Sequence, residues 1–260
     1  MAAHMRTRHL STLQVVTYNI HKGHLGRHGV TVIALREALR KIGGDIVFLQ
    51  EVQGVSHRHT ARYADWPRMP QHEYLAADEW IDFAYGRNAV YPDGHHGNGI
   101  LSRFPVVNWH NLDISQSGLE QRGLLHCEIR APDWPTSLHC VNLHLGLLGG
   151  WRKRQMALLY TYLEQHVPFE APLIVAGDFN DWSQRSSPRL RGRFDLMEAF
   201  EVMTGKPARS FPARLPLLRL DRIYVRGFRV EAVDIHPGPR GGGLSDHAAL
   251  SATLTRILCT

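Results

Sequence analysis

Short apolar runs separated by polar or turn residues make up most of this chain and predict a fold rich in strands. The first run, Leu13–Tyr18, is apolar enough for a buried strand and ends at the polar Asn19. Val32–Ile42 has apolar residues at helical spacing and stops at two glycines, and Asp45–Leu49 is a second buried strand. The chain therefore begins with a strand, a helix and a strand.

Later apolar runs are shorter, and the four between residues 99 and 143 are separated by turn residues, which predicts antiparallel meanders. We expect strands at Gly99–Leu101, Val106–Leu112, Gly123–Arg130, Ser137–Leu143, Leu173–Ala176, Arg222–Val225, Phe228–Ile235 and Ala248–Leu254. Trp151–His166 has apolar residues at helical spacing and predicts an amphipathic helix. The whole pattern predicts one two-sheet α/β domain over residues 13–260, with helices covering each sheet.

Two regions lack this pattern. Ser56–Asn98 has few periodic signals and is rich in His, Tyr and Trp, so we expect part of it to be a surface loop near a functional site. Residues 1–12 precede the first strand, and Ala2-Ala3-His4-Met5 resembles a cloning scar. We therefore expect a tag remnant and tail here, with Met5 as the natural start.

Polar residues that can bind metals or transfer protons follow five of the apolar runs. They are Asn19, Glu51, Asn142 with His144, Asp178 with Asn180, and Asp246 with His247. Strand ends are where a rigid scaffold presents side chains to a ligand. We therefore expect these residues to gather at one edge of the fold.

The residue types in this set fit phosphoryl chemistry at a hard cation. Glu51 offers the oxygen ligand that Mg²⁺ prefers, and Asp178 with Asn180 offers a base or acceptor and an amide donor for an attacking water. His247, beside Asp246, can stabilise charge on phosphoryl oxygens. The sequence has no zinc-type cysteine spacing, no GxxxxGK[ST] phosphate loop and no GxSxG nucleophile motif.

Composition and cysteine content indicate where in the cell the protein is expected. The chain has 260 residues, 43% of them hydrophobic, without an apolar run of about 18 residues, so we expect no membrane-spanning helix. Cys127, Cys140 and Cys259 fit reduced thiols, and the N-terminal region lacks an apolar signal sequence. These features predict a cytoplasmic protein, and we take a monomer as the expected state.

The net charge of +6 is unevenly spread. Residues 185–240 contain 12 Lys/Arg against 6 Asp/Glu, so this segment carries the whole excess. A basic region beside a catalytic site attracts a polyanion such as nucleic acid, and the same field attracts anionic phospholipid head groups. The alternative is a solvated basic face without a partner.

Eight ordered motifs resemble those of the endonuclease/exonuclease/phosphatase superfamily, and together they cover roughly residues 13–255. They are TYNIHKG (Thr17–Gly23), LQE (Leu49–Glu51), GNGILSR (Gly97–Arg103), RG (Arg122-Gly123), NLHL (Asn142–Leu145), GDFN (Gly177–Asn180), LDRIY (Leu220–Tyr224) and SDHAAL (Ser245–Leu250). The match is deoxyribonuclease-like. The YNIHKG form looks closer to a bacterial branch of uncharacterised members, some of them suspected of phospholipid-related roles.

The resemblance implies a four-layer α/β sandwich of two packed mixed sheets flanked by helices, and a Mg²⁺ or Mn²⁺ cofactor. The implied metal-side residues are Glu51, Asn19 and Asp246. The implied catalytic residues are Asp178, Asn180, His247, His144 and Asp221. The implied phosphate contacts are Asn98 and Arg122, with Asn142 as a third candidate.

Within the catalytic set, the resemblance implies a distinct role for each residue. Asp178 activates or orients the attacking water, and Asn180 holds that water or a phosphate oxygen. His247 contacts the scissile phosphate while Asp221 orients its ring. His144 assists the leaving group or stabilises charge.

Several residues keep two interpretations at this stage. Asn142 is either a site residue or a hydrogen-bonded core amide. Asp221 is either the partner of His247 or the partner of a neighbouring arginine. His21 is either a metal-side residue or a loop residue, and Trp182 is either a lid over the site or simple packing.

Three functions fit the sequence. The first is a metal-dependent DNA nuclease, favoured by the basic segment and the family resemblance. The second is a phospholipid or small-molecule phosphoesterase of the sphingomyelinase kind, favoured by His21 and His144 at positions where abasic-site endonucleases differ. The third is a binding module that kept only the fold, which the intact Glu51, Asp178 and His247 argue against.

Overall fold

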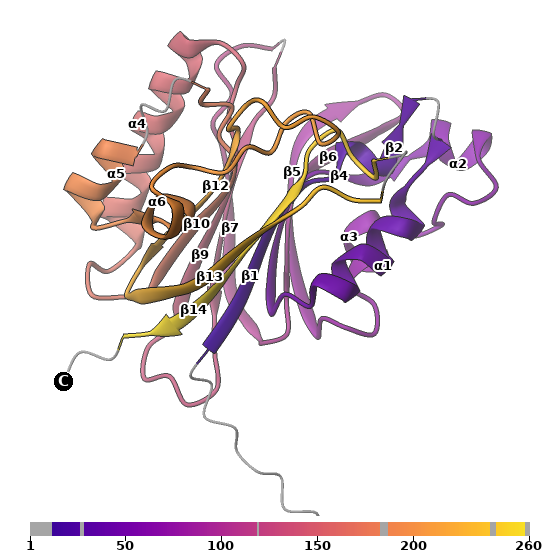
Figure 1. Ribbon diagram of the computed structural model, residues 1–260. Coiled ribbons are helices and arrows are strands. Elements are labelled where there is room, and N and C mark those ends of the chain that lie inside the picture. The colour runs from indigo at the N-terminus through magenta and orange to yellow at the C-terminus, as the bar shows by residue number, and fades with distance from the viewer. Residues whose placement is uncertain (1–11, 27–28, 119, 183–186, 240–242, 258–260) are drawn as a thin grey trace, which may run out of the picture.

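The computed structural model describes residues 12–26, 29–118, 120–182, 187–239 and 243–257. Two six-stranded sheets lie face to face, and helices cover the outer side of each (Figure 1). The predicted four-layer α/β sandwich of two mixed sheets is confirmed. The predicted tail, apart from Thr12, and Cys259 lie outside the described residues.

The first sheet has the strand order β13-β14-β1-β4-β6-β5. Its strands are β1 (Thr12–Asn19), β4 (Ile46–Ser56), β5 (Asp82–Tyr91), β6 (Gly94–Ser102), β13 (Phe228–His236) and β14 (Ala249–Arg256). β1 and β4 are parallel and the other neighbours are antiparallel. A 3-10 turn (His21–Gly23) and a ribbon of β2 (His24–Leu25) with β3 (Gly29–Val30) follow β1.

The second sheet has the strand order β11-β12-β10-β9-β8-β7. Its strands are β7 (Val106–Asp113), β8 (Gly123–Ile129), β9 (Leu138–His144), β10 (Leu173–Asp178), β11 (Met197–Glu198) and β12 (Asp221–Arg226). β9 and β10 are parallel, and the other neighbours are antiparallel. The predicted meander is therefore present in β7, β8 and β9.

Buried apolar side chains form three clusters, one between the two sheets and one on the outer side of each sheet. Phe48, Ile100 and Ile174 belong to the core between the two sheets. On the outside of the first sheet lie α1 (Val32–Ile42), α2 (His57–Arg62) and α3 (Gln71–Ala76), and on the outside of the second lie α4 (Gly149–His166) and α5 (Ser187–Phe194) (Figure 1). The short α6 (Ala199–Thr204) buries Phe200 at the edge of the inter-sheet core. Within the part of the chain that is described, no helix has the length and apolar character needed to cross a bilayer.

Ser56–Asn98 contains α2, α3, β5 and the first half of β6, so loop is limited to shorter segments such as residues 63–70 and 77–81. β5 is an edge strand that alternates buried and exposed positions, and its polar residues weaken the apolar signal. Gly97 of β6 lies against Gly86 of β5, where an added Cβ would be 1.8 Å from the Gly86 carbonyl oxygen. These glycines therefore allow two backbones to approach closely and do not mark a turn.

Glu198 links β11 to α6 and carries a carboxylate that is 1% exposed. Its Oε2 accepts a 2.7 Å hydrogen bond from the Glu201 backbone N–H. Burial raises the pKa of Glu198 to about 7, and that hydrogen bond and the charge of Arg222 offset the burial only in part. A raised acid pKa stabilises the fold below the unfolded pKa of 4.5, and the effect is lost as the pH rises through about 7.

We expect this group to lower the free energy of unfolding by about 2–3 kcal/mol as the pH rises from about 4.5 to about 8. A Glu198→Gln variant, which stays neutral, should lose most of that slope. Urea unfolding at several pH values measures the effect. Glu37→Gln, at an exposed position of α1, is the control. A Glu198→Gln variant with the slope of the unsubstituted protein would contradict the assignment.

Candidate active site

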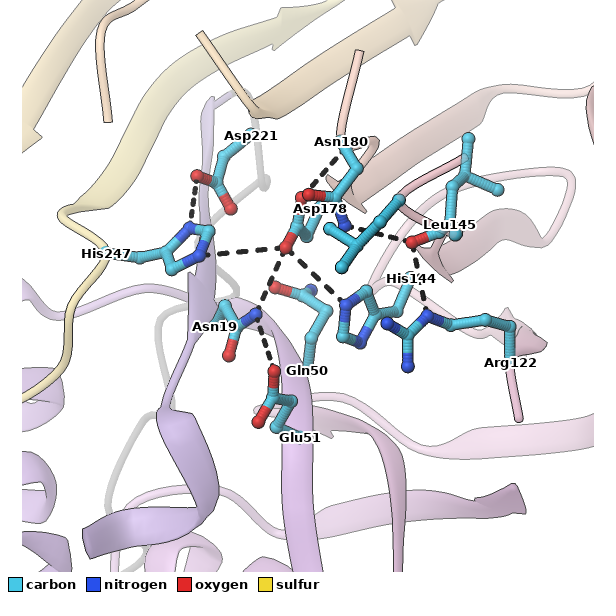
Figure 2. Close-up of polar contacts among 12 residues, drawn as sticks. Asn19, Gln50, Glu51, Arg122, His144, Leu145, Asp178, Asn180, Asp221 and His247 are labelled. Carbon is cyan, nitrogen blue, oxygen red and sulfur yellow. Dashed lines mark hydrogen bonds and ion pairs between the residues drawn. The ribbon is translucent and has the colours of Figure 1, made fainter. Parts of the chain in front are cut away.

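The predicted site residues meet where the two sheets present the ends of their parallel strands. β1 ends at Asn19, β9 ends at His144 and β10 ends at Asp178. In the register of the second sheet, Asp178 lies opposite His144 on one side and Asp221 on the other. The backbone alone therefore brings these three side chains together, and Figure 2 shows them converging with residues of the first sheet.

Asp178 is the centre of this group and is 2% exposed. Its Oδ2 accepts a 3.1 Å hydrogen bond from Asn19 Nδ2 and lies 3.6 Å from His144 Nε2 and 3.7 Å from His247 Nε2. Its Oδ1 accepts a 2.9 Å hydrogen bond from the Asn180 backbone N–H. Burial raises the pKa of Asp178 to about 6, against the opposing charge of His247. The carboxylate is therefore held in place and is a stronger base than an exposed aspartate.

His247 is paired with the buried Asp221. Its Nδ1 lies 2.8 Å from Asp221 Oδ2, and the ring packs 5.0 Å from that of Phe211. Burial lowers the pKa of His247, but the charges of Asp221 and Asp178 outweigh it and raise the pKa to about 10. Arg222, the other partner considered for Asp221, donates instead to the carbonyl oxygens of Arg219 and Asp221. The pair leaves a protonated Nε2 facing Asp178.

His144 approaches Asp178 from the opposite side of the site (Figure 2). Burial, reinforced by the charges of Arg122 and His247, holds the pKa of His144 well below its usual value. The surroundings of the two histidines beside Asp178 therefore shift their pKa values in opposite directions. Such a difference suits them to different proton-transfer roles.

Glu51 lies within β4 at an interruption of the pairing with β6, between Leu49 and Val52. Its backbone has a φ of 56°, a left-handed conformation that is uncommon for residues other than glycine. Asn19 Nδ2 donates to Glu51 Oε1 at 3.3 Å as well as to Asp178, and Asn19 Oδ1 accepts from the His21 backbone N–H at 3.1 Å. Asn19 thus presents an amide nitrogen to both carboxylates and fixes their spacing.

Asp246 completes the acidic side of the site. Its Oδ1 lies 3.3 Å from His21 Nδ1 and accepts a hydrogen bond from Ser245 Oγ. The hydrogen bond to Asp246 raises the pKa of His21 despite burial, and the charges of Asp246 and Glu51 act in the same direction. His21 therefore lies beside Asp246, in the 3-10 turn that follows β1.

The carboxylates of this region offer the oxygen ligands that a hard divalent cation prefers. Glu51 and Asp178 both accept from Asn19 Nδ2, and Asp246 lies beside His21. Among the described residues, Asp178, Asp221 and His247 have ligand-type atoms within 4.8 Å of one another. In that group the 2.8 Å contact between His247 and Asp221 already provides a partner for both side chains. Glu51 and Asp246 could hold a cation without breaking that pair.

Arg122 lies at the mouth of the site. Its Nε donates to the Leu145 carbonyl oxygen at 3.2 Å, and its guanidinium pairs with Glu120 at 2.7 Å. Asn180 Nδ2 donates to the same carbonyl at 2.9 Å, so the two residues are linked through one backbone atom (Figure 2). Arg122 and Glu51 both line an open hollow of about 510 Å³. Arg122 is thus positioned beside the site with part of its charge neutralised.

The other two predicted phosphate contacts lie deeper. Asn142 is fully buried: its Nδ2 donates to the carbonyl oxygens of Leu49 and Gly99, both at 2.8 Å, and its Oδ1 accepts from Gln50 Nε2 at 2.8 Å. Every polar group of this amide is used in joining β9 to the first sheet, which corresponds to the core-amide alternative. Asn98 is 1% exposed and donates to the Gly123 carbonyl oxygen at 2.9 Å.

Three further residues support the site although the sequence assigned them no role. Gln50 connects Asn142 to Thr17, and Ser245 Oγ donates to the Asn19 carbonyl oxygen at 2.6 Å. Both belong to the motifs LQE and SDHAAL, and this membership was their only signal in the sequence. Phe211 packs on His247 from a loop without any recognisable motif. Trp182 is 47% exposed and lies over the Arg152 guanidinium at 4.5 Å, outside the contacts of the catalytic group.

Several known proteins have sequences or folds similar to those of this chain. A relative named Uncharacterized protein YbhP, from Escherichia coli strain K12, is 44% identical over 244 residues, which cover 94% of this chain and 96% of YbhP. The family model described as the Endonuclease/Exonuclease/phosphatase family matches residues 16–247.

Crystal structures with low sequence identity share the fold. An endonuclease/exonuclease/phosphatase from Beutenbergia cavernae has a TM-score of 0.74 at 20% identity and covers 95% of this chain and 72% of its own. The human Nocturnin catalytic domain with bound sulfate has a TM-score of 0.74 at 18% identity, covering 95% and 94%. TDP2 of D. rerio complexed with a single strand DNA product has a TM-score of 0.69 at 18% identity, covering 94% and 99%.

The family match extends from β1 to His247 and so includes every motif that contributes to the site. The 44% identity to YbhP also holds over nearly the whole of both chains. The chain therefore belongs to the Endonuclease/Exonuclease/phosphatase family, whose members hydrolyse phosphoester bonds with the help of a divalent metal ion.

Proposed function

We propose that this protein is a divalent-metal-dependent phosphodiester hydrolase. The observation that carries the proposal is the position of Asp178, one buried carboxylate whose Oδ2 lies within 3.7 Å of the Nε2 atoms of both His144 and His247. A hydrolase needs a base for water and a proton or positive charge for the phosphate oxygens. The group around Asp178 supplies both within one site.

In this mechanism Asp178 accepts a proton from the attacking water, and its elevated pKa suits it to that task. Asn180 holds the Asp178 carboxylate through its backbone N–H and keeps it in the orientation required. His247, fixed by Asp221, stabilises the charge that develops on a non-bridging phosphate oxygen. His144 and Arg122 face the same region and serve the leaving group and the phosphate.

Glu51 and Asp246 would hold the cation, with Asn19 keeping Glu51 at a fixed distance from Asp178. Oxygen ligands of this kind suit Mg²⁺ or Mn²⁺. When bound, the cation would supply positive charge opposite the phosphoryl oxygens.

DNA is the first substrate to test, because the sequence has a basic segment and TDP2 with a DNA product is similar in fold. Much of the positive charge in that segment is, however, used within the protein. Arg222 and Arg226 are buried and donate to backbone carbonyl oxygens. Arg191 and Arg193 pair with glutamates. The charge excess therefore overstates the basic surface that faces a polyanion.

A phospholipid or other small phosphoester is the second candidate. It is favoured by exposed leucines in the loop after Phe211, which a nucleic-acid surface does not require. These leucines lie within a few residues of Ala213, whose N–H donates to the Asp246 carbonyl oxygen at 2.7 Å. An apolar surface at the mouth of the site suits a substrate with an apolar part.

A substrate panel tests the proposal. Purified protein with Mn²⁺ is assayed on plain DNA, abasic DNA, RNA, phospholipid vesicles and bis(p-nitrophenyl) phosphate, with EDTA as the control. We expect metal-dependent release of product from at least one of these phosphodiesters and none with EDTA. Absence of hydrolysis of every substrate in the panel would contradict the proposed function.

Glu51→Gln tests the cation site. Replacing the carboxylate with an amide removes a charged ligand while keeping its size, so we expect Mn²⁺ to bind about 10–100-fold more weakly. Calorimetric titration with Mn²⁺ measures this without a substrate. Glu73→Gln, an exposed residue of α3, is the control. Equal affinity in Glu51→Gln and the control would show that the cation binds elsewhere.

A further inference from the structure

A short segment beside the catalytic histidine combines exposed leucines with positive charge. We call it the 211–219 loop, and its sequence is FPARLPLLR. Leu215 is 66% exposed, Leu217 is 55% exposed and Leu218 is 40% exposed. Single exposed leucines are ordinary on protein surfaces, but three within four residues form an apolar patch that needs an explanation.

The 211–219 loop has a defined conformation. The N–H groups of Leu217 and Leu218 both donate to the Phe211 carbonyl oxygen, at 2.8 Å and 2.7 Å. At its base, Ala213 donates to the Asp246 carbonyl oxygen. Figure 1 shows this orange segment passing over the end of the sandwich where the site lies. The leucines are therefore displayed from a structure attached directly to Asp246 and His247.

Basic residues precede and follow the leucines along the chain. Between Lys206 and Leu220 there are four basic residues and no acidic one, namely Lys206, Arg209, Arg214 and Arg219. Arg214 also lines a hollow of about 430 Å³ that reaches His21 and Asp246. Lys206, Arg209 and Arg214 are exposed, and Arg219 is half-buried and donates from Nε to the Pro207 carbonyl oxygen at 2.9 Å. Exposed leucines close to basic residues are typical of surfaces that enter the head-group region of an anionic bilayer.

The opposite wall of the site is also apolar at its rim. Leu147 and Leu148 follow β9 and are 52% and 54% exposed. They line the hollow of about 510 Å³ that contains Glu51, Arg122 and Lys22. The polar floor of the site thus lies between two apolar edges, which suits a phosphate group held at the surface of a bilayer.

We propose that the 211–219 loop docks on the surface of an anionic phospholipid bilayer and so presents a bilayer phosphodiester to the site. The docking is inferred from the loop and does not depend on catalysis. The hydrolysis of a bilayer substrate, by contrast, rests on the proposed function. Burying an exposed leucine side chain contributes about 1.5–3 kcal/mol when burial is complete. Three leucines together with basic residues are sufficient for reversible binding to a membrane surface.

Vesicle co-sedimentation of the full chain tests the docking. We expect binding to phosphatidylglycerol/phosphatidylcholine vesicles, weaker binding to phosphatidylcholine alone, and a decrease with salt. The triple variant Leu215→Ser, Leu217→Ser, Leu218→Ser should bind the anionic vesicles on the order of 100-fold more weakly. A matched triple variant, Ile33→Ser, Ile81→Ser, Leu158→Ser, removes apolar residues that are exposed elsewhere and should bind within about twofold of the unsubstituted protein.

A charge variant gives a second measurement that does not depend on the leucines. Arg209→Glu should weaken binding to anionic vesicles about tenfold, while Lys41→Glu, at the end of α1, should not. Unchanged circular dichroism spectra verify that each variant is folded.

Three results would overturn the docking proposal. The first is failure of the unsubstituted protein to bind anionic vesicles. The second is equal binding by the unsubstituted protein and the leucine triple variant. The third is that the triple variant loses DNA binding or self-association and keeps vesicle binding. Hydrolysis of bis(p-nitrophenyl) phosphate is measured in parallel, because this substrate needs no bilayer. Vesicle binding without any hydrolysis would reject the proposed function and leave the docking intact, whereas the reverse result would reject the docking only.

Discussion

An Asp178→Asn variant is expected to lower kcat by about 10²–10⁴-fold, because the amide cannot accept the proton of the attacking water. The change keeps the size of the side chain and leaves an oxygen for the Asn180 backbone N–H. It also removes a buried charge, so the free energy of unfolding should stay the same or rise. Steady-state kinetics with Mn²⁺ and urea unfolding of the same preparation separate the two effects.

His247→Ala should reduce kcat to a similar degree, since it removes the charge that faces the phosphate oxygen. Because the two residues act on one step, the double variant should be about as slow as either single variant. His57→Ala, in the exposed helix α2, is the matched control. Unchanged kcat in Asp178→Asn would reject the mechanism, whichever phosphodiester is the substrate.

Asn142→Ala is expected to lower the free energy of unfolding by about 3–5 kcal/mol, because two buried carbonyl oxygens lose their donor. Those oxygens belong to Leu49 and Gly99 of the first sheet, and the side chain that serves them comes from β9 of the second. Urea unfolding measures the loss. Asn108→Ala, an exposed amide of β7 that donates to Glu128, should change stability by less than about 0.5 kcal/mol.

The same variant distinguishes the two interpretations of Asn142. If the residue contacts substrate, Asn142→Ala should keep its stability and raise KM. If it joins the sheets, Asn142→Ala should lower the free energy of unfolding. The KM measured at low temperature, where the variant is still folded, should then equal that of the unsubstituted protein. A stable variant with a raised KM would restore the phosphate-contact interpretation from the sequence.

Much of the fold could be predicted because its central strands are buried on both faces. Leu173–Ala176 and Asp45–Leu49 stand out as apolar runs, and α1 has the bounds that its periodicity predicts. β5 was missed because it is an edge strand, and half of its side chains face solvent. The short β11, α5 and α6 were missed as well, since their positions depend on contacts with β12 and β13 more than on local sequence.

For the site, the sequence indicated the strand ends, and the register of β9, β10 and β12 explains why three of them meet. How deeply each of these polar side chains is buried could not be predicted from the sequence. Asn142 lies within β9 and its side chain reaches the first sheet, whereas Asn180 comes two residues after the end of β10 and has a φ of 47°. The apolar pattern of the preceding strand does not encode this local left-handed conformation of Asn180.

The proposed catalytic group is divided between the two sheets. Asn19, Glu51 and His247 belong to the first sheet or the turn before β14, whereas His144, Asp178 and Asp221 belong to the second. Even the 2.8 Å contact between His247 and Asp221 joins one sheet to the other. A displacement of about 1 Å at a reacting group can lower a rate about 100-fold.

The distances in the site therefore depend on how the apolar side chains between the sheets fit together. A smaller side chain at Ile174 or Phe48, both in that inter-sheet core, changes no catalytic residue but permits the sheets to shift. Turnover in such a protein would decline with temperature before the fold melts, because sliding of two intact layers needs less energy than their unfolding. The catalytic rate of this protein should therefore depend on how accurately its two sheets are aligned.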